Sequence, residues 1–271
     1  MELNIADTSG LHYLGNYVRT MPVSLHRMME NAYDWEHLPF IHPSAFASIE
    51  LIDQGEWGWQ CRTTLPAAAG GGEQELQLLV DRARHYWATT VLSGAGEGVQ
   101  IHTQATANNA HSIEVDVRFY LPQPPQNQAQ GSAILAYLQN QYAGLYDEDE
   151  ALMSARQTAL DNREWDGSGN PRQIDLGRAV ELDKTVTHSV ALANGAFTVR
   201  YDDGEWIAHA SQCPHMLGPL ADAAIVDKHI VCPWHNYAFA VRGGEEREQR
   251  CGALPEPPSL TIRDGRLIVG D

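Results

Sequence analysis

Two short motifs in the C-terminal third of the chain bring cysteine and histidine close together. The first pairs Cys213 with His215, and the second pairs Cys232 with His235. Thiolate is a soft ligand that suits iron and imidazole is a borderline one, so a cluster with two sulfur ligands on one iron and two nitrogen ligands on the other is reasonable. Two Cys and two His satisfy a tetrahedral zinc ion equally well by count. The ligand set alone leaves an iron–sulfur cluster and a structural zinc site open.

The residues around these motifs favour the cluster. A proline follows each cysteine, Gly218 and Leu220 follow the first pair, and aromatic residues follow the second. This arrangement resembles the paired ligand loops of Rieske 2Fe-2S proteins. The resemblance implies a Rieske-type 2Fe-2S cluster, whose four expected ligands are Cys213, His215, Cys232 and His235.

The same loops bear on the redox potential. Rieske proteins of respiratory chains usually carry a disulfide between the loops and a Ser and a Tyr that hydrogen-bond the cluster. Here the loops hold no third cysteine, and those two positions are Tyr237 and Phe239. Fewer hydrogen bonds to sulfur imply a potential toward the low end of the Rieske range, as in the ferredoxin and oxygenase branch. Asn236 replaces the usual glycine after the second histidine, and Asn also tolerates positive φ.

A second group of candidate ligands lies nearer the N-terminus. Residues 31–42 resemble the D-x-x-H-x4-H segment of Rieske non-heme iron oxygenases, with Asp34, His37 and His42 at the motif positions. In an ideal helix the two histidines would be about 140° apart, and Pro39 can supply the distortion that they need to face one metal. With a carboxylate from elsewhere they would form a facial triad, which leaves positions on Fe(II) for dioxygen, water and nearby substrate.

The carboxylate is expected from the acidic segment 146–150, whose spacing resembles the E-D-x-x-apolar segment of the same family. We predict Asp149 as the ligand. Asp147 and Glu150 stay open, because acidic residues at the start of a helix also stabilise the helix dipole without any metal.

Two further features surround this expected iron site. Asp34 lies one turn before His37 and matches the family's bridging carboxylate, which hydrogen-bonds a metal histidine and, across a subunit contact, a cluster histidine. It is therefore the expected electron bridge. Aromatic residues in the strands could line a substrate cavity, although such residues are more often plain core. The candidates are Trp57, Trp59, Tyr86, Trp87 and Phe119.

The elements that must position these residues fall into two units. Residues 21–42 open with a helical pattern that we expect to loosen at its proline. Residues 49–122 hold four short alternating runs, at 51–65, 75–92, 99–108 and 111–121. Breaks rich in Gly or Asn separate them, at 70–72, 94–98 and 108–109, which predicts an antiparallel meander. After a polar break at 123–131, helical spacing returns for some thirty residues and predicts a long closing helix. Short strand-like pieces follow a linker-like stretch at 166–173.

These elements predict an α+β fold. The helix, meander and closing helix match the helix-grip catalytic domain of these oxygenases, a START/Bet v1-like antiparallel sheet with helices, and a small all-β Rieske domain follows. The expected domains are 1–165 with mononuclear iron and 179–271 with the cluster, joined by a linker at 166–178. Family members usually place the Rieske domain first, so the domain order is reversed here.

Composition limits the function classes. The formal net charge is −17, and Lys184 and Lys228 are the only lysines. A phosphate-binding face needs clustered Lys and Arg, so nucleic acid and anionic membranes are not expected partners. Four cysteines in 271 residues do not form a secreted disulfide framework. No run of about 18 apolar residues and no basic-then-apolar leader occurs, so a soluble cytoplasmic protein is expected.

Together, the resemblance implies a terminal oxygenase component. It would take electrons from a ferredoxin or flavin reductase, pass them through the cluster, and activate dioxygen at mononuclear Fe(II) to hydroxylate, dealkylate or dihydroxylate a small, aromatic or otherwise apolar substrate. In the family, head-to-tail trimers bring one subunit's cluster near the next subunit's iron, so a homotrimer is expected. The alternative is a Rieske electron-transfer protein fused to a ligand-binding module without catalytic iron.

Overall fold

The computed structural model of the chain describes residue 5, residues 7–163 and residues 169–270. The chain divides into two compact units, 1–154 and 155–271. Residues 166–168 of the expected linker, and the first four residues, lie outside the described part. The domain boundaries expected from the sequence stay predictions.

The first unit is built on a seven-stranded antiparallel sheet in the order β1-β7-β6-β5-β4-β3-β2. Its strands are β1 (His12–Met21), β2 (Ser48–Gly55), β3 (Gly58–Thr64), β4 (Glu73–Asp81), β5 (Tyr86–Gly94), β6 (Gln100–Asn109) and β7 (Ser112–Leu121). Alternate residues of β7 are completely buried, as expected where one face of a strand covers a core. These residues are Ile113, Val115, Val117 and Phe119.

The predicted meander is confirmed, with two differences in its strands. β1 precedes the expected meander and pairs with β7 at the opposite edge from β2. Two stretches expected as single runs are hairpins, β2 with β3 and β4 with β5. The predicted glycine break at 94–98 ends β5. There Gly94 has φ +90°, and a Cβ at this position would lie 2.1 Å from the carbonyl oxygen of Glu73, so only glycine fits.

The helical segment before the meander consists of two helices, α1 (Leu25–Tyr33) and α2 (Leu38–Ile41). The prediction that one helix loosens at Pro39 is wrong, because the chain already leaves the helical conformation at Asp34, which is extended. Pro39 lies in the first turn of α2. A first-turn backbone N–H has no partner within the helix, so proline is tolerated there.

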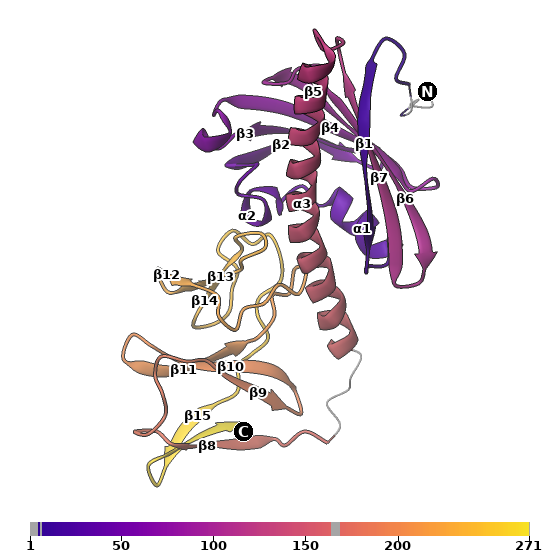
Figure 1. Cartoon of the computed structure of the whole chain (residues 1–271). Coiled ribbons are helices and arrows are strands. Elements are labelled where there is room, and N and C mark those ends of the chain that lie inside the picture. The colour runs from indigo at the N-terminus through magenta and orange to yellow at the C-terminus, as the bar shows by residue number, and fades with distance from the viewer. Residues whose placement is uncertain (1–4, 6, 164–168, 271) are drawn as a thin grey trace. The chain divides into compact units, whose positions relative to one another are not determined.

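The predicted closing helix is confirmed as α3 (Gln128–Arg163). Figure 1 shows its N-terminal part lying along the sheet of the first unit, and Tyr142 of α3 contacts Phe119 of β7 with ring centroids 5.3 Å apart. An antiparallel sheet packed against one long helix is the predicted helix-grip, START/Bet v1-like arrangement. Among the helices of the described residues, none combines the length and the apolar character needed to cross a membrane.

The second unit contains three small antiparallel sheets, β11-β10-β9, β12-β13-β14 and β15-β16-β8. Their strands are β8 (Gln173–Arg178), β9 (His188–Leu192), β10 (Gly195–Asp202), β11 (Glu205–Ala210), β12 (Ile225–Val226), β13 (His229–Val231), β14 (Ala238–Ala240), β15 (Leu260–Arg263) and β16 (Arg266–Gly270). Phe197, Val199 and Leu267 lie in its buried core. The predicted α+β class, with a small all-β domain after the helix-grip domain, is confirmed.

Candidate metal centres

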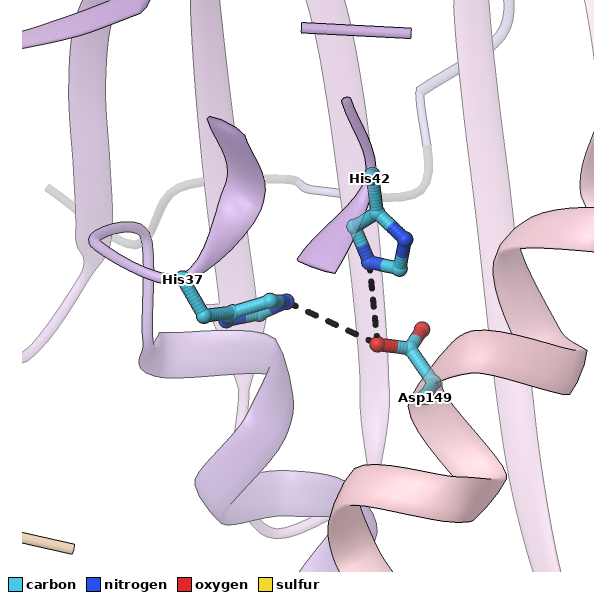
Figure 2. A group of neighbouring side chains, drawn as sticks. All are labelled: His37, His42 and Asp149. Carbon is cyan, nitrogen blue, oxygen red and sulfur yellow. Dashed lines mark hydrogen bonds and ion pairs between the residues drawn. The ribbon is translucent and has the colours of Figure 1, made fainter. Parts of the chain in front are cut away.

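Three predicted ligands of the iron site come together in the first unit (Figure 2). His37 and His42 flank the single turn of α2, one at each end, and Asp149 projects from α3. Oδ1 of Asp149 lies 3.0 Å from Nε2 of His42 and 3.5 Å from Nε2 of His37. The candidate ligand atoms of the three residues all lie within 4.8 Å of one another, and all three residues are buried. Two imidazoles and one carboxylate form the donor set of a mononuclear non-heme Fe(II) site.

The second ring nitrogen of each histidine, Nδ1, faces a further carboxylate. Nδ1 of His37 lies 3.5 Å from Oδ2 of Asp34, and Nδ1 of His42 lies 2.7 Å from Oε2 of Glu148. A carboxylate that accepts a hydrogen bond from Nδ1–H keeps the proton on that nitrogen, leaves the Nε2 lone pair free for a metal and fixes the ring. The sequence singled out Asp34 but not Glu148 for such a role. The signal for Glu148 was its place beside the predicted ligand in the acidic segment.

The two acidic residues left open as ligands have other partners. Arg19 of β1 pairs with Asp147 at 2.7 Å and with Glu150 at 2.8 Å. Asp147 and Glu150 are three positions apart and so lie on one face of the helix, which meets Arg19, whereas Asp149 points toward the histidines. Of the acidic candidates, Asp149 is the one that the structure brings to His37 and His42.

The electrostatics of the site couple its acid and base groups. Burial lowers the pKa of His37, but hydrogen bonds and charges from Asp149 and Asp34 outweigh burial and raise it to about 10. Burial raises the pKa of Asp149, but His37 and His42 outweigh burial and hold it well below its usual value. The carboxylate is therefore ionised at neutral pH, as a metal ligand must be.

A cavity of about 130 Å³ adjoins the three residues. Its walls are mostly apolar and include Trp59 and Trp87, two of the aromatic residues that the sequence suggested. Tyr142 and Tyr146 of α3 also line the cavity, and burial raises the pKa of each hydroxyl above its usual value. The sequence analysis missed these two tyrosines, although they precede Asp149 by seven and three positions and so share its helix face. The other suggested aromatic residues, Trp57, Tyr86 and Phe119, are not among the lining residues.

The expected cluster ligands lie in two loops of the second unit with the same backbone hydrogen-bond pattern. One loop follows β11 and the other follows β13. The N–H of Cys213 donates to the carbonyl of Gly218 at 2.9 Å, and the N–H of Cys232 donates to the carbonyl of Tyr237 at 2.8 Å. Each loop therefore closes on itself five residues after its cysteine.

A left-handed residue stands four positions after each cysteine. These residues are Leu217, with φ +62°, and Asn236, with φ +57°. Their N–H groups donate to the carbonyls of Cys213 and Cys232, both at 3.0 Å. Asn adopts positive φ readily, as the sequence analysis expected, whereas Leu does so only when its surroundings hold it there.

The four expected ligand side chains gather where the loops meet. The rings of His215 and His235 lie with centroids 4.6 Å apart. The thiol of Cys213 donates a hydrogen bond to the sulfur of Cys232, which lowers the pKa of Cys232 and raises that of Cys213. A Cβ at Gly218 would lie 2.7 Å from Sγ of Cys232, so the loop leaves room there for no side chain. Two sulfurs and two imidazoles at the tips of paired loops fit the donor set of a Rieske cluster.

Comparison with known proteins supports the assignment of this part of the chain as a Rieske domain. Residues 172–258 match the family described as the Rieske [2Fe-2S] domain. Over 72 residues the chain is 33% identical to the oxygenase component of dicamba O-demethylase from Stenotrophomonas maltophilia, which is 27% of this chain and 21% of that protein. The matching part thus spans about a fifth of the relative's length. The chain contains a Rieske domain, and that domain implies a 2Fe-2S cluster and an electron-transfer role.

Solved structures match the first unit more loosely. The Zhui aromatase/cyclase from Streptomyces sp. R1128 has a TM-score of 0.46 at 12% identity, and the match covers 54% of this chain and 95% of that one. A START superfamily protein from Mycobacterium smegmatis has a TM-score of 0.38 at 14% identity, over 56% and 97% of the two chains. Ara h 8.0201 has a TM-score of 0.41 at 18% identity, over 54% and 99%.

Proposed function

We propose that this chain is the terminal oxygenase component of a Rieske non-heme iron system. A 2Fe-2S cluster would be ligated by Cys213, His215, Cys232 and His235, and an Fe(II) ion by His37, His42 and Asp149. When bound, the cluster supplies single electrons, and the mononuclear iron supplies a centre at which dioxygen is activated for hydroxylation, dealkylation or dihydroxylation.

One observation carries the catalytic part of this proposal. The two Nε2 atoms and a carboxylate oxygen converge at the wall of a largely apolar cavity. A buried carboxylate with two buried imidazoles would be a costly arrangement in a module that only binds apolar ligands. It is the arrangement that a 2-His-1-carboxylate iron site requires.

The protein's own residues would do the remaining work of such a site. Asp34 and Glu148 hold the Nδ1 atoms of the two histidines and so orient both rings. The indoles of Trp59 and Trp87 line the cavity and would limit the access of water, which would lower the local dielectric around the reacting groups. The volume of about 130 Å³ is close to that of an engineered apolar cavity, roughly 150 Å³, that binds benzene. A substrate about the size of one six-membered ring is therefore part of the proposal.

The proposal includes the partners and location that the family resemblance implies. Electrons come from a ferredoxin or flavin reductase, the working form is a homotrimer, and the compartment is the cytoplasm. The catalytic domain spans 1–165, the linker 166–178 and the Rieske domain 179–271, in the reverse of the usual order. Asp34 is the proposed electron bridge between a metal histidine and a cluster histidine.

A second candidate is a Rieske electron-transfer protein whose first unit only binds a small ligand. The largely apolar cavity of the helix-grip unit supports this alternative, because binding an apolar ligand there would need no iron. Iron stoichiometry separates the two candidates. An oxygenase would hold about three irons and two acid-labile sulfides per chain, whereas an electron-transfer protein would hold about two of each.

The test is anaerobic purification of the parent and of a His37→Ala, His42→Ala double variant, followed by iron and sulfide analysis. Loss of about one iron with sulfide unchanged in the variant supports the oxygenase. A His26→Ala, His111→Ala double variant, which changes two exposed histidines, is the matched control and should keep the parent's iron. About two irons in all three proteins would make the electron-transfer candidate the better one. A colourless parent that contains zinc would overturn both.

A further inference from the structure

The ring of Tyr237 is stacked between a predicted cluster ligand and a positive charge. His215 stacks on it with ring centroids 4.5 Å apart and an interplanar angle of 14°. The guanidinium carbon of Arg250 lies 3.8 Å from the centroid of the same ring. Two planar groups at these distances would collide on one face, so the imidazole and the guanidinium lie on opposite faces of the tyrosine.

Two carboxylates hold this arginine in place. Nη2 of Arg250 lies 3.2 Å from Oε1 of Glu246, and Nε of Arg250 lies 3.2 Å from Oε2 of Glu248. Guanidinium contacts with two carboxylates and an aromatic face restrict the side chain far more than a single surface ion pair would. The positive charge therefore has a fixed position relative to the ring of His215.

Glu246 is the buried anchor of this arrangement. Its side chain is 0% exposed and accepts hydrogen bonds from the N–H groups of Glu248 at 3.0 Å and Arg250 at 2.9 Å. Burial raises the pKa of Glu246, but the backbone and side-chain hydrogen bonds from Arg250 outweigh burial and hold it below its usual value. The carboxylate is thus ionised, and it contacts Nη2 of the guanidinium that lies against the tyrosine ring.

We propose that Arg250 is a positioning residue that orients His215 through Tyr237 and raises the midpoint potential of the Rieske cluster. Reduction adds one electron to the cluster, so a fixed positive charge nearby stabilises the reduced state. The family resemblance implies fewer hydroxyl hydrogen bonds to the cluster than in respiratory-chain Rieske proteins, and a stacked cation would offset part of that lack. The proposal rests on His215 being a cluster ligand, which is part of the proposed function.

The test compares midpoint potentials of full-length holoprotein by redox titration, monitored by electron paramagnetic resonance of the reduced cluster. Arg250→Gln removes the charge and leaves Glu246 uncompensated, so its potential should shift negative. Arg250→Lys keeps a charge but loses the planar stack, so its shift should be negative and smaller. Arg242→Gln, which removes an exposed arginine paired with Glu205, is the matched control and should leave the potential unchanged.

A potential of Arg250→Gln equal to those of the parent and the control would overturn the proposal. If Arg250→Gln does not retain a cluster, Arg250→Lys and Glu248→Gln decide. The lysine variant should shift negative, and the glutamine variant, which removes a negative charge beside Arg250, should shift positive. Parent-like potentials in both would overturn it. A parent that lacks acid-labile sulfide and a Rieske-type signal would instead refute the proposed cluster site, which is a separate outcome.

Discussion

Oδ1 of Asp149 lies 3.0 Å from Nε2 of His42, although 107 positions separate the two residues in the sequence. His42 ends the short helix α2, and Asp149 lies in the long helix α3 that closes the first unit. The contact exists only when the meander between them has folded into the sheet that holds both helices. The candidate iron site is therefore a product of the tertiary fold of this unit, and its parts can be tested one at a time.

Asp149→Asn should lose the mononuclear iron and keep the cluster. An amide is a far weaker ligand than the carboxylate it replaces, so the iron content should fall by about one per chain with sulfide unchanged. Glu150→Gln is the matched control, because it changes the next residue of the same helix, which pairs with Arg19. Metal and sulfide analysis checks both. If Asp149→Asn keeps as much iron as Glu150→Gln and the parent, Asp149 is ruled out as a ligand.

Glu148→Gln should weaken Fe(II) binding while the ligands stay intact. Glu148 holds Nδ1 of His42 at 2.7 Å, and loss of such an outer partner typically costs about 10–100-fold in metal affinity. The protein is first freed of mononuclear iron. Titration with Fe(II), followed by competition with a chelator, then measures the change in Fe(II) affinity. Asp147→Asn, an exposed neighbour that pairs with Arg19, should bind iron like the parent. Parent-like affinity in Glu148→Gln would contradict the assigned role.

Asp34→Asn should separate electron transfer from metal binding. The carboxylate lies 3.5 Å from Nδ1 of His37 and is the proposed bridge toward a cluster histidine. We expect iron content near that of the parent but a slower reoxidation of the reduced cluster in a single turnover with dioxygen, by at least about tenfold. Rapid-mixing absorption spectroscopy follows the cluster. An unchanged rate of cluster reoxidation would show that electron transfer to the iron does not depend on this carboxylate.

Gly218→Ala should disrupt the cluster site in the second unit. The added Cβ would lie 2.7 Å from Sγ of Cys232 and 3.1 Å from the indole of Trp234. Relief of such overpacking costs about 1–3 kcal/mol and would move a ligand sulfur. Visible absorption and sulfide content should fall. Gly252→Ala, whose Cβ would meet nothing within 4 Å, should keep both at the parent's level. Loss of colour in both variants would contradict this account of Gly218.

His102 should make the stability of the first unit depend on pH. The side chain is completely buried and faces Tyr86 of β5, Gln100 of β6, and Arg118 and Tyr120 of β7. Burial, and then the charge of Arg118, lowers its pKa below the ordinary value of 6.5. In the unfolded chain the imidazole binds a proton at about pH 6.5, whereas in the folded unit it stays neutral to lower pH.

The sign of the effect follows from proton binding. Below pH 6.5 the unfolded state binds more protons than the folded state, so stability is full above that pH and falls as the pH drops toward the folded pKa. Hydrogen-exchange mass spectrometry of peptides from β6 and β7, between pH 5 and pH 8, measures this. The exchange rates are first corrected for the intrinsic effect of pH. In His102→Gln the slope of stability against pH should be shallower. Equal slopes in the two proteins would contradict a depressed pKa for His102.

Much of the fold could be predicted because its signals are local. The alternation of Ile113, Val115, Val117 and Phe119 identified β7, and the glycine break at 94–98 identified a strand end. β1 was missed because its residues are only partly buried and alternate weakly. The end of the first helix at Asp34 was also missed. Proline was the visible helix breaker, whereas the break depends on the extended backbone of Asp34, which no residue type signals.

The candidate site divides in the same way. The resemblance to two family motifs was enough to name His37, His42 and Asp149 as candidates, because each motif lies within one short segment, and the structure brings the three residues together. Glu148 and the tyrosines of α3 could not be assigned, since their roles depend on which face of a long helix meets α2 and the cavity. The stack of Arg250 on Tyr237 was equally hidden, because it joins residues from two different loops.

The placement of His37 and His42 at the two ends of α2 limits how this segment can evolve. One inserted or deleted residue in Leu38–Ile41 would rotate one imidazole by about 100° relative to the other and shift it by about 1.5 Å along the axis. A change in amino-acid type within the turn leaves that spacing intact, as Pro39 illustrates. Sequence drift here is thus tolerated in composition but not in length, and four intervening residues are a fixed requirement when related sites are sought.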